Sequence, residues 1–475
     1  MNEHDNTAIV VGAGPNGLAA AVALAQAGMD VTVLEAADTI GGGTRTQELT
    51  LPGVLHDVCS AVHPFGVASP FLSSLPLQQH GLKWLWPEVD LAHPLEHGRA
   101  GTLVKDLDTT VDGLGVDGEA WRRAFGPMVA HFDDLIAEMF QPLLHLPAHP
   151  LLMARFGLRA MPSAKFFARR WQTDEARALF AGIAAHIVRP LTAPTTAAVG
   201  VMMGAAGHRS GWPVAQGGSQ AITESLASLL RSLGGTIETG HRVDRLADLP
   251  PAAVTMLDVA PGAVIRMAGD RLPARARKSY ATWRHGPGAF KLDLAVEGGI
   301  PWTNPAARRA GTVHLGGTFE EIAAAEAAVT AGRMPDRPFV LVAQQYLADP
   351  SRSAGDVHPI WAYAHVPHGH PGDHTDAILT QFERFAPGTR ERIVGSHVMG
   401  PAALESYNAN YVGGDIATGA NDPMQVVFRP RFAVDPYATG VPGVWLCSAA
   451  TAPGAGVHGM CGANAAARAL KTLQR

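Results

Sequence analysis

The sequence predicts an α/β fold: a parallel sheet wound on both faces by helices, into which a second, α+β domain is inserted. Three observations predict it. A strand–glycine turn–helix–strand unit opens the chain, a second glycine-rich turn before an Ala-rich helix lies near its end, and a block of period-two alternation lies between them. At 475 residues the chain is also too long for one simple core, which favours two interleaved domains.

The opening unit covers residues 8–36. Residues 9–11 are a β-branched run typical of a buried parallel strand, and the run ends at the G-x-G-x-x-G turn of Gly12, Gly14 and Gly17. Residues 18–27 are strong helix formers, and residues 31–34 form a second apolar run that ends in Glu35. With strand, turn, helix, strand and acid in register, the unit predicts a dinucleotide site.

The chemistry of that site follows from its glycines and its acid. Gly12 permits the tight turn, Gly14 lets backbone approach a pyrophosphate, and Gly17 lets the helix pack close to the strand. Glu35 stands 18 residues beyond Gly17, where a carboxylate can accept hydrogen bonds from a ribose diol. The contacts expected from this unit are Gly12, Gly14, Pro15, Asn16, Gly17, Glu35 and Ala36.

A second glycine-rich turn follows at residues 41–46. It can approach the pyrophosphate from the other side, with Arg45 available for charge, although a glycine-rich surface loop is the alternative interpretation. Near the end of the chain, a short strand at 444–447 leads through the turn 453–459 into an Ala-rich helix that starts near 457–459. A helix N-terminus there would stabilise negative charge on the pyrimidine edge of a reduced flavin. The two ends together therefore favour a resident flavin over an exchanging nicotinamide nucleotide.

The pairing of VVGAGPNGLAAA, the acid and GGG with LCSAATAPGAGVHGMCGANAAARA resembles the flavoprotein superfamily of phytoene desaturases, carotenoid isomerases and amine oxidases. The sequence most resembles the bacterial FAD-dependent, phytoene-dehydrogenase-related oxidoreductases, and residues 286–302, 313–322 and 408–419 match that group as well. The resemblance implies a Rossmann-like FAD-binding domain, tightly but non-covalently bound FAD, and an apolar substrate cavity over the flavin. The chain departs from the family pattern at Gly43, at Ser448 and in a shortened β-meander after residue 243.

The resemblance also implies that the backbone of Val243 bonds to the adenine. The remaining expected FAD contacts are Gly42, Gly43, Thr44, Arg45, Val62, Val243, Ser448, Gly456, Val457 and His458. We expect a discontinuous FAD-binding domain of residues 1–75, 215–285 and 406–475, and a substrate domain of residues 76–214 and 286–405.

Several further elements support this division. The FAD-binding domain is expected to include a helix at 219–233 and strands at 237–243 and 254–259. The second piece of the substrate domain is expected to carry strands at 289–296, 312–315, 339–345 and 360–366. In its first strand Phe290, Leu292, Leu294 and Val296 alternate with Lys291, Asp293 and Ala295, so we expect the apolar face to roof the substrate cavity.

Hydride transfer to flavin N5 needs positioning of a substrate C–H more than a side-chain base. His63 and His458 are nevertheless the candidate catalytic residues, because both loops are expected to flank the flavin; the alternative is that each only packs and bonds to backbone. Arg429 is a candidate anchor for a substrate carboxylate or a flavin-proximal loop, with a structural salt bridge as the alternative. The histidines are otherwise scattered, and no metal is expected.

Composition excludes some partners and suggests others. The formal net charge of −5 gives no electrostatic case for nucleic acid. Three scattered cysteines and a first strand that begins by Ala8 favour a reduced, cytoplasmic setting with no signal peptide. Residues 151–171 mix apolar and basic side chains, which favours a helical lid over the cavity and leaves peripheral membrane contact as the alternative.

Taken together, the sequence predicts an FAD-dependent oxidoreductase that desaturates or oxidises a hydrophobic substrate such as a carotenoid or polyene lipid. A flavin amine oxidase, a non-redox polyene isomerase that uses reduced FAD, and a flavoprotein that only binds a partner remain alternatives. No second strand-associated G-x-G-x-x-G is present, so quinone or oxygen is a better expected electron acceptor than NAD(P). The sequence does not indicate the oligomeric state.

Overall fold

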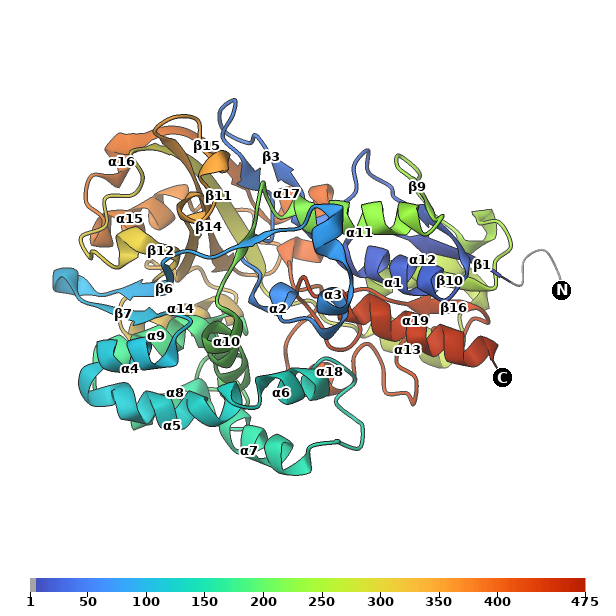
Figure 1. The fold of residues 1–475 in the computed structure, drawn as a ribbon, viewed down its shortest axis with the longest axis horizontal. Coiled ribbons are helices and arrows are strands. Elements are labelled where there is room, and N and C mark those ends of the chain that lie inside the picture. The colour runs from blue at the N-terminus through green and yellow to red at the C-terminus, as the bar shows by residue number, and fades with distance from the viewer. Residues whose placement is uncertain (1–5, 475) are drawn as a thin grey trace.

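The computed structural model describes residues 6–474 and folds into two lobes that lie side by side (Figure 1). The first and last elements, β1 and α19, both belong to the lobe drawn on the right of Figure 1. A sheet forms the centre of each lobe, and the chain passes between the lobes several times.

The first lobe is built on a five-stranded parallel sheet with the order β16-β10-β1-β2-β9. Its strands are β1 (Thr7–Val11), β2 (Asp30–Leu34), β9 (Thr236–Glu238), β10 (Val254–Leu257) and β16 (Val444–Leu446). Because all five strands are parallel, their carboxyl ends meet at one edge. Gly12, Glu35, Asp258 and Ser448 follow directly or closely after four of these strands and so come together there.

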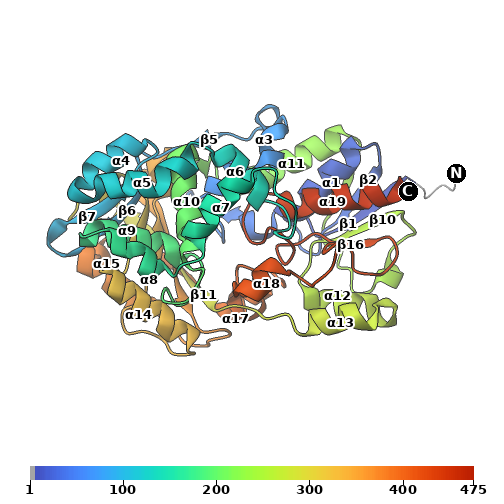
Figure 2. The ribbon, with the colours of Figure 1, turned by 90° about the horizontal axis from the view of Figure 1, so that it is seen from below.

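Helices cover both faces of this sheet (Figure 2). Val10, Val33 and Met256 point to one face and pack in a core with α1 (Pro15–Gln26), α11 (Gln220–Ser232) and α19 (Met460–Leu473). Ile9 and Leu257 point to the other face, toward α12 (Pro261–Ala268) and α13 (Ala274–Ala281). The predicted α/β class, with a doubly wound Rossmann-like sheet, is confirmed.

The second lobe contains a seven-stranded sheet with the order β15-β11-β14-β13-β12-β6-β7, antiparallel except for the pair β6 and β12. Its strands are β6 (Val89–Pro94), β7 (Ala100–Leu103), β11 (Gly288–Glu297), β12 (Ala310–Leu315), β13 (Val340–Ala343), β14 (Val357–Val366) and β15 (Ile393–Met399). Two short antiparallel pairs accompany the lobes: β3 (Thr46–Gln47) with β4 (His56–Asp57), and β5 (Trp84–Leu85) with β8 (Val214–Ala215).

The apolar face of β11, which was expected to roof the cavity, points away from it. The side chains of Phe290, Leu292, Leu294 and Val296 pack instead against Ile378, Phe382 and Phe385 of α15 (Thr375–Phe385). Alternation shows only which residues share a face, and here a helix covers the apolar one. The opposite face, which carries Ala289, Trp361 and Tyr363, is the one that lines the cavity.

Helices close the cavity side of the second lobe. They include α4 (Leu107–Gly113), α5 (Gly118–Val129), α6 (Phe132–Met139), α7 (Pro150–Ala160), α8 (Ala164–Phe167), α9 (Asp174–Ala185), α10 (Ala197–Ser210) and α14 (Phe319–Thr330). The shorter helices of the chain are α2 (Pro64–Val67), α3 (Pro70–Ser74), α16 (Thr389–Arg392), α17 (Pro401–Tyr407) and α18 (Pro423–Val427). Among residues 6–474, none of the helices combines the length and the apolar character that crossing a membrane requires.

Four predicted strands are shorter in the structure, and the one expected at 444–447 ends at Leu446 as β16. The strand expected at 237–243 ends with β9 at Glu238, because Gly240 has φ +67° and turns the chain back so that its N–H donates to Ala37 O. The strand expected at 254–259 ends at Leu257, and the one expected at 339–345 covers only β13, after which Gln345 begins a short 3₁₀ turn. The domain boundaries given above stay a prediction.

Candidate functional site

A single large cavity of about 1670 Å³ extends from the carboxyl edge of the parallel sheet into the second lobe. Both glycine-rich turns and the C-terminal turn line it, together with apolar side chains of the second lobe. All the site residues predicted from the sequence line this cavity except Gly17 and Thr44. Thr44 is buried, and its hydroxyl donates to Gly41 O.

Backbone is packed so closely within the first glycine turn, and between it and the second turn, that side chains would not fit. A Cβ on Gly17 would lie 2.0 Å from Gly12 O, and one on Gly42 would lie 3.0 Å from the Gly14 Cα. Gly12 itself has φ +104°, a conformation that favours glycine. Backbone therefore lines this end of the cavity, as a pyrophosphate site at a helix N-terminus requires.

Glu35 is held in place by the backbone. Its Oε2 accepts from Ala13 N–H at 2.7 Å, and its Oε1 accepts from Ala37 N–H at 2.9 Å. The Arg45 guanidinium lies 3.6 Å from Oε1 and donates to Thr39 O at 2.7 Å. Both side chains line the cavity. The two backbone hydrogen bonds fix the direction of the carboxylate, whereas the Arg45 guanidinium donates its hydrogen bonds within its own loop.

Asp258 is a site residue that the sequence reasoning missed. It follows β10, lines the cavity, and accepts from Gly17 N–H at 2.9 Å through Oδ2. Burial, with a further contribution from the charge of Glu35, raises the pKa of Asp258 to about 7. Its position at the carboxyl end of a strand beside the first glycine turn was the available signal.

The C-terminal turn places backbone at the cavity wall. Gly456 has φ +140°, and Gly459, at φ +67°, precedes α19. The side chain of His458 accepts from Met460 N–H at 3.1 Å through Nδ1, and burial lowers its pKa to about 4. His458 is therefore a neutral residue that caps the helix, although it also lines the cavity.

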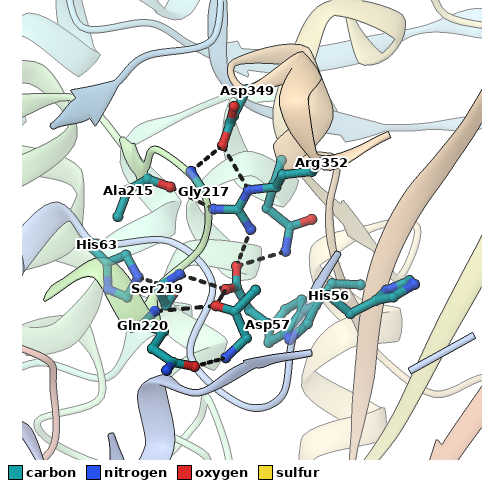
Figure 3. A network of polar contacts seen from close by, with 12 residues as sticks. His56, Asp57, His63, Ala215, Gly217, Ser219, Gln220, Asp349 and Arg352 are labelled. Carbon is teal, nitrogen blue, oxygen red and sulfur yellow. Dashed lines mark hydrogen bonds and ion pairs between the residues drawn. The ribbon is translucent and has the colours of Figure 1, made fainter. Parts of the chain in front are cut away.

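His63 is held by a buried polar network that links the two lobes (Figure 3). Its Nε2 lies 2.7 Å from Ser219 Oγ, and the Ser219 N–H donates to Asp57 Oδ1 at 2.7 Å. Asp57 accepts in turn from Arg352 Nη1 at 2.5 Å. Burial lowers the pKa of His63 to about 4 against the opposing charge of Asp57, so the imidazole at the cavity wall is neutral.

Arg429 is almost completely buried and lines the cavity beside the C-terminal turn. Its Nε donates to Ala450 O at 3.4 Å, and its guanidinium lies over the ring of Trp283 at 5.7 Å. Among residues 6–474 it forms no ion pair within 4.0 Å, and its Nη2 has no hydrogen-bond partner. The structural salt bridge considered above is therefore not present in the described part of the chain.

Apolar side chains form one part of the rest of the cavity, which we call the apolar chamber. It is lined by side chains of α6, α7, α10 and β14, among them Met139, Met153, Phe156, Met202, Met203, Trp361 and Tyr363. Helix α7 covers it with Met153 and Phe156, while Leu151 and Leu158 on the same helix are exposed. The chamber can therefore accept an apolar molecule next to the polar end of the cavity.

Comparison with known proteins supports the fold and a broad class. The family model described as an NAD(P)-binding Rossmann-like domain matches residues 10–74. The chain is 24% identical to the pyridine nucleotide-disulfide oxidoreductase domain-containing protein 2 of Rattus norvegicus, across 98% of this chain and 94% of that protein.

Solved oxidoreductase structures share the fold along nearly the whole chain. An oxidoreductase from Methanosarcina mazei has a TM-score of 0.63 at 16% identity and covers 99% of this chain and 100% of its own. A putrescine oxidase, solved with putrescine bound, has a TM-score of 0.59 at 19% identity, with 99% of each chain covered. Cyclohexylamine oxidase from Brevibacterium oxydans has a TM-score of 0.55 at 16% identity, with coverages of 99% and 100%. At these identities the likeness establishes a shared fold and leaves the substrate to be determined.

Proposed function

We propose that this chain is an FAD-dependent oxidoreductase that desaturates or oxidises a hydrophobic substrate of the carotenoid or polyene-lipid type. The observation that supports this most is the single cavity that joins the glycine turns and the C-terminal turn to an apolar chamber. The glycine turns near the start of the chain and the turn near its end line the same cavity, so one dinucleotide could contact both.

The residues at the polar end fit FAD. Gly12, Gly14 and Gly42 line this end of the cavity with backbone, because a Cβ on Gly12 or Gly14 would crowd Asp258 and one on Gly42 would crowd Gly14. Glu35 presents a fixed acceptor for ribose hydroxyls. Val243 also lines the cavity, and its backbone is the contact that we propose for the adenine. Bound FAD would supply the acceptor for a hydride from the substrate.

The protein's own contribution is positioning and the exclusion of water. The chamber residues of α7 and β14 would hold a C–H bond of the substrate against the cofactor. His63, neutral and fixed by Ser219, would offer a hydrogen bond at the wall without adding charge. We further propose that α7 acts as a lid; its exposed Leu151 and Leu158, with the exposed basic Arg155, also support peripheral contact with a membrane.

Three alternatives remain: an amine oxidase, a polyene isomerase and a flavoprotein that only binds a partner. An amine oxidase is suggested by the putrescine and cyclohexylamine oxidases of the same fold, and a pair of tyrosines beside the flavin would favour it. Tyr407 and Tyr411 both line the cavity, and Tyr407 donates its hydroxyl to Gly42 O at 2.6 Å. Tyr437 is fully buried and donates to Ala452 O. A polyene isomerase that keeps its FAD reduced would use the same cavity.

The test begins with the purified protein. We expect a yellow protein with an FAD spectrum, whose flavin is released completely by heat or acid. Flavin retained on the precipitated chain would mean a covalent link, and a colourless protein that takes up no FAD would overturn the proposal. Anaerobic bleaching by a polyene, but not by putrescine or cyclohexylamine, would separate the proposal from the amine-oxidase alternative. Reoxidation by oxygen, a quinone and NAD(P)⁺ in parallel would identify the acceptor.

A further inference from the structure

Exposed apolar side chains gather in two short segments of the chain. Among residues 6–474, nine of the fifteen large apolar side chains that are exposed lie in residues 144–166 and 424–434. The first segment contributes Leu144, Leu146, Leu151, Leu158, Met161 and Phe166. The second contributes Met424, Phe432 and Val434. We call these nine residues the α7–α18 patch.

The two segments are neighbours in space and border an opening of the cavity. Leu144 and Val434 line the same small surface hollow of about 60 Å³. Figures 1 and 2 show α6, α7 and α18 together on one side of the molecule. Met161, which follows α7, and Pro423 of α18 are exposed and also line the large cavity. The cavity therefore reaches the surface within the α7–α18 patch.

Helix α7 carries apolar side chains on both of its sides. Met153 and Phe156 line the cavity, whereas Leu151 and Leu158 are 77% and 78% exposed. Leu151, Arg155 and Leu158 are spaced i, i+4 and i+7, so they form one stripe that points outward. Single exposed leucines are ordinary, but a group of them beside a cavity opening indicates a surface that another body covers.

The same segments carry positive charge and no acid. Residues 140–173 contain five cations and neither aspartate nor glutamate, and residues 423–434 likewise contain no acid. The five cations are Arg155, Arg159, Lys165, Arg169 and Arg170, and within residues 6–474 none of them forms an ion pair. Two acids of the adjacent α6 already have partners. Asp133 lies 2.8 Å from the Arg209 guanidinium, and Asp134 lies 3.6 Å from the His149 ring.

This combination of side chains decides what fits the patch. Leucine and phenylalanine side chains can enter the boundary between headgroups and acyl chains, while cations on long stems stay at the level of lipid phosphates. A second copy of this chain, related by a two-fold axis, would bring the same five cations against these five, and the two sets would repel. The whole chain carries a net charge of −5, so attraction to an anionic surface is confined to this side and would orient the molecule.

We propose that the α7–α18 patch docks on a bilayer that contains anionic phospholipid, with the cavity opening onto the bilayer. The inference rests on the proposed function and deepens it, because it names the partner surface and the route of the substrate. An apolar molecule dissolved in the bilayer would pass between α7 and α18 into the chamber without crossing water.

The experiment measures sedimentation of the purified holoprotein with extruded vesicles of two kinds: phosphatidylcholine alone, and an equal mixture of phosphatidylcholine and phosphatidylglycerol. We expect binding to the mixed vesicles to be at least about tenfold tighter than to phosphatidylcholine, and to weaken in high salt. Arg155→Gln should weaken binding to the mixed vesicles about fivefold. Arg275→Gln, the same change at an exposed arginine of α13, should leave it unchanged.

The apolar contribution is tested by a matched pair of double variants. Leu151→Asp combined with Leu158→Asp should weaken binding to the mixed vesicles about tenfold or more. Val116→Asp combined with Leu233→Asp changes the net charge equally at exposed positions outside the patch, and should leave most of the binding intact.

A fluorescent label reports which side meets the lipid. Cys59, Cys447 and Cys461 are all buried, so a cysteine introduced by Leu158→Cys can be labelled selectively with a nitrobenzoxadiazole group. Its emission should rise and shift to the blue with the mixed vesicles. The same label at Leu233→Cys should not respond.

Four outcomes would overturn the inference: no vesicle binding by the wild type, equal binding to both kinds of vesicle, unchanged binding by the Leu151 and Leu158 double variant, or a dimer that this double variant dissociates in sedimentation velocity. The first two need no variant. The flavin content of each sample is read from its absorbance. Bound flavin without vesicle binding would overturn the docking surface alone, and vesicle binding by a protein that takes up no FAD would overturn the proposed function alone.

Discussion

Removing Arg352 should destabilise the protein strongly, because the side chain compensates a carboxylate that has no access to water. Arg352 and Asp57 are both 0% exposed and are joined at 2.5 Å, and Arg352 also donates to Ala215 O at 2.7 Å. In Arg352→Met the Asp57 charge would be left buried and unpaired, at a cost of about 3–5 kcal/mol. Asp349, the other acidic partner, keeps the Gly217 N–H and the Ser351 hydroxyl as donors.

The size of this effect should depend on pH in a defined direction. Burial alone would raise the pKa of Asp57, but the Arg352 guanidinium and the Ser219 N–H outweigh burial and hold it below its ordinary value. In the wild type the pair therefore stabilises the fold above about pH 4, and this contribution is lost as the pH falls through the folded pKa. In Arg352→Met burial prevails, Asp57 takes up a proton more readily, and the deficit relative to the wild type should shrink from pH 8 to pH 5.

Equilibrium urea unfolding of the holoprotein, followed by tryptophan fluorescence at both pH values, measures the effect. The control is Asp57→Asn combined with Arg352→Met, which removes both charges and should recover about 2 kcal/mol of the loss. A loss below about 1 kcal/mol for the single variant at pH 8, or a double variant no more stable than the single one, would refute the reasoning.

Three further predictions concern the cofactor end. Glu35→Gln replaces a fixed carboxylate with a weaker acceptor and should weaken FAD binding by about 1–3 kcal/mol, so unchanged flavin retention on dialysis would show that Glu35 does not bind the ribose. Because the pKa of Asp258 is raised to about 7, its carboxyl becomes charged at higher pH and would then repel a pyrophosphate. The FAD affinity of the wild type should therefore fall between pH 6 and pH 8.5, whereas the affinity of Asp258→Asn should stay level. Arg429→Met removes a buried cation that has no ion pair in the described chain, so the midpoint potential of the bound flavin should fall by ~30 mV or more. An unchanged potential would place Arg429 away from the flavin.

Local signals in the sequence predicted the cofactor end of the cavity well. Gly12 and Gly14 stand in a pattern that only a close backbone approach explains, and Glu35 stands at the end of the next strand. The structure places all three at the cavity wall. Such residues can be predicted because strand, turn and helix are consecutive in the chain.

Features that depend on tertiary contacts were missed or misplaced. Asp258 reaches Gly17 only after β10 inserts beside β1, a contact between residues far apart in the chain. The face of β11 was assigned wrongly because the layer that covers it, α15, comes much later in the sequence. The buried contact between His365 and Glu326 was not predicted at all, since each is a single polar residue in an apolar segment and only the fold brings them together.

Side chains of β13 and β14 alternate strictly between the α15 core and the chamber, and this affects how the protein can evolve. Val340 and Val342 build the packed core with α15, whereas their immediate neighbours Leu341 and Ala343 line the chamber. A substitution at 341 or 343 reshapes the space offered to a substrate while the adjoining core remains intact. Single-residue steps along one strand can therefore change the substrate range while the α15 core stays intact, at the cost of contacts that Leu341 and Ala343 make in the core on the chamber side.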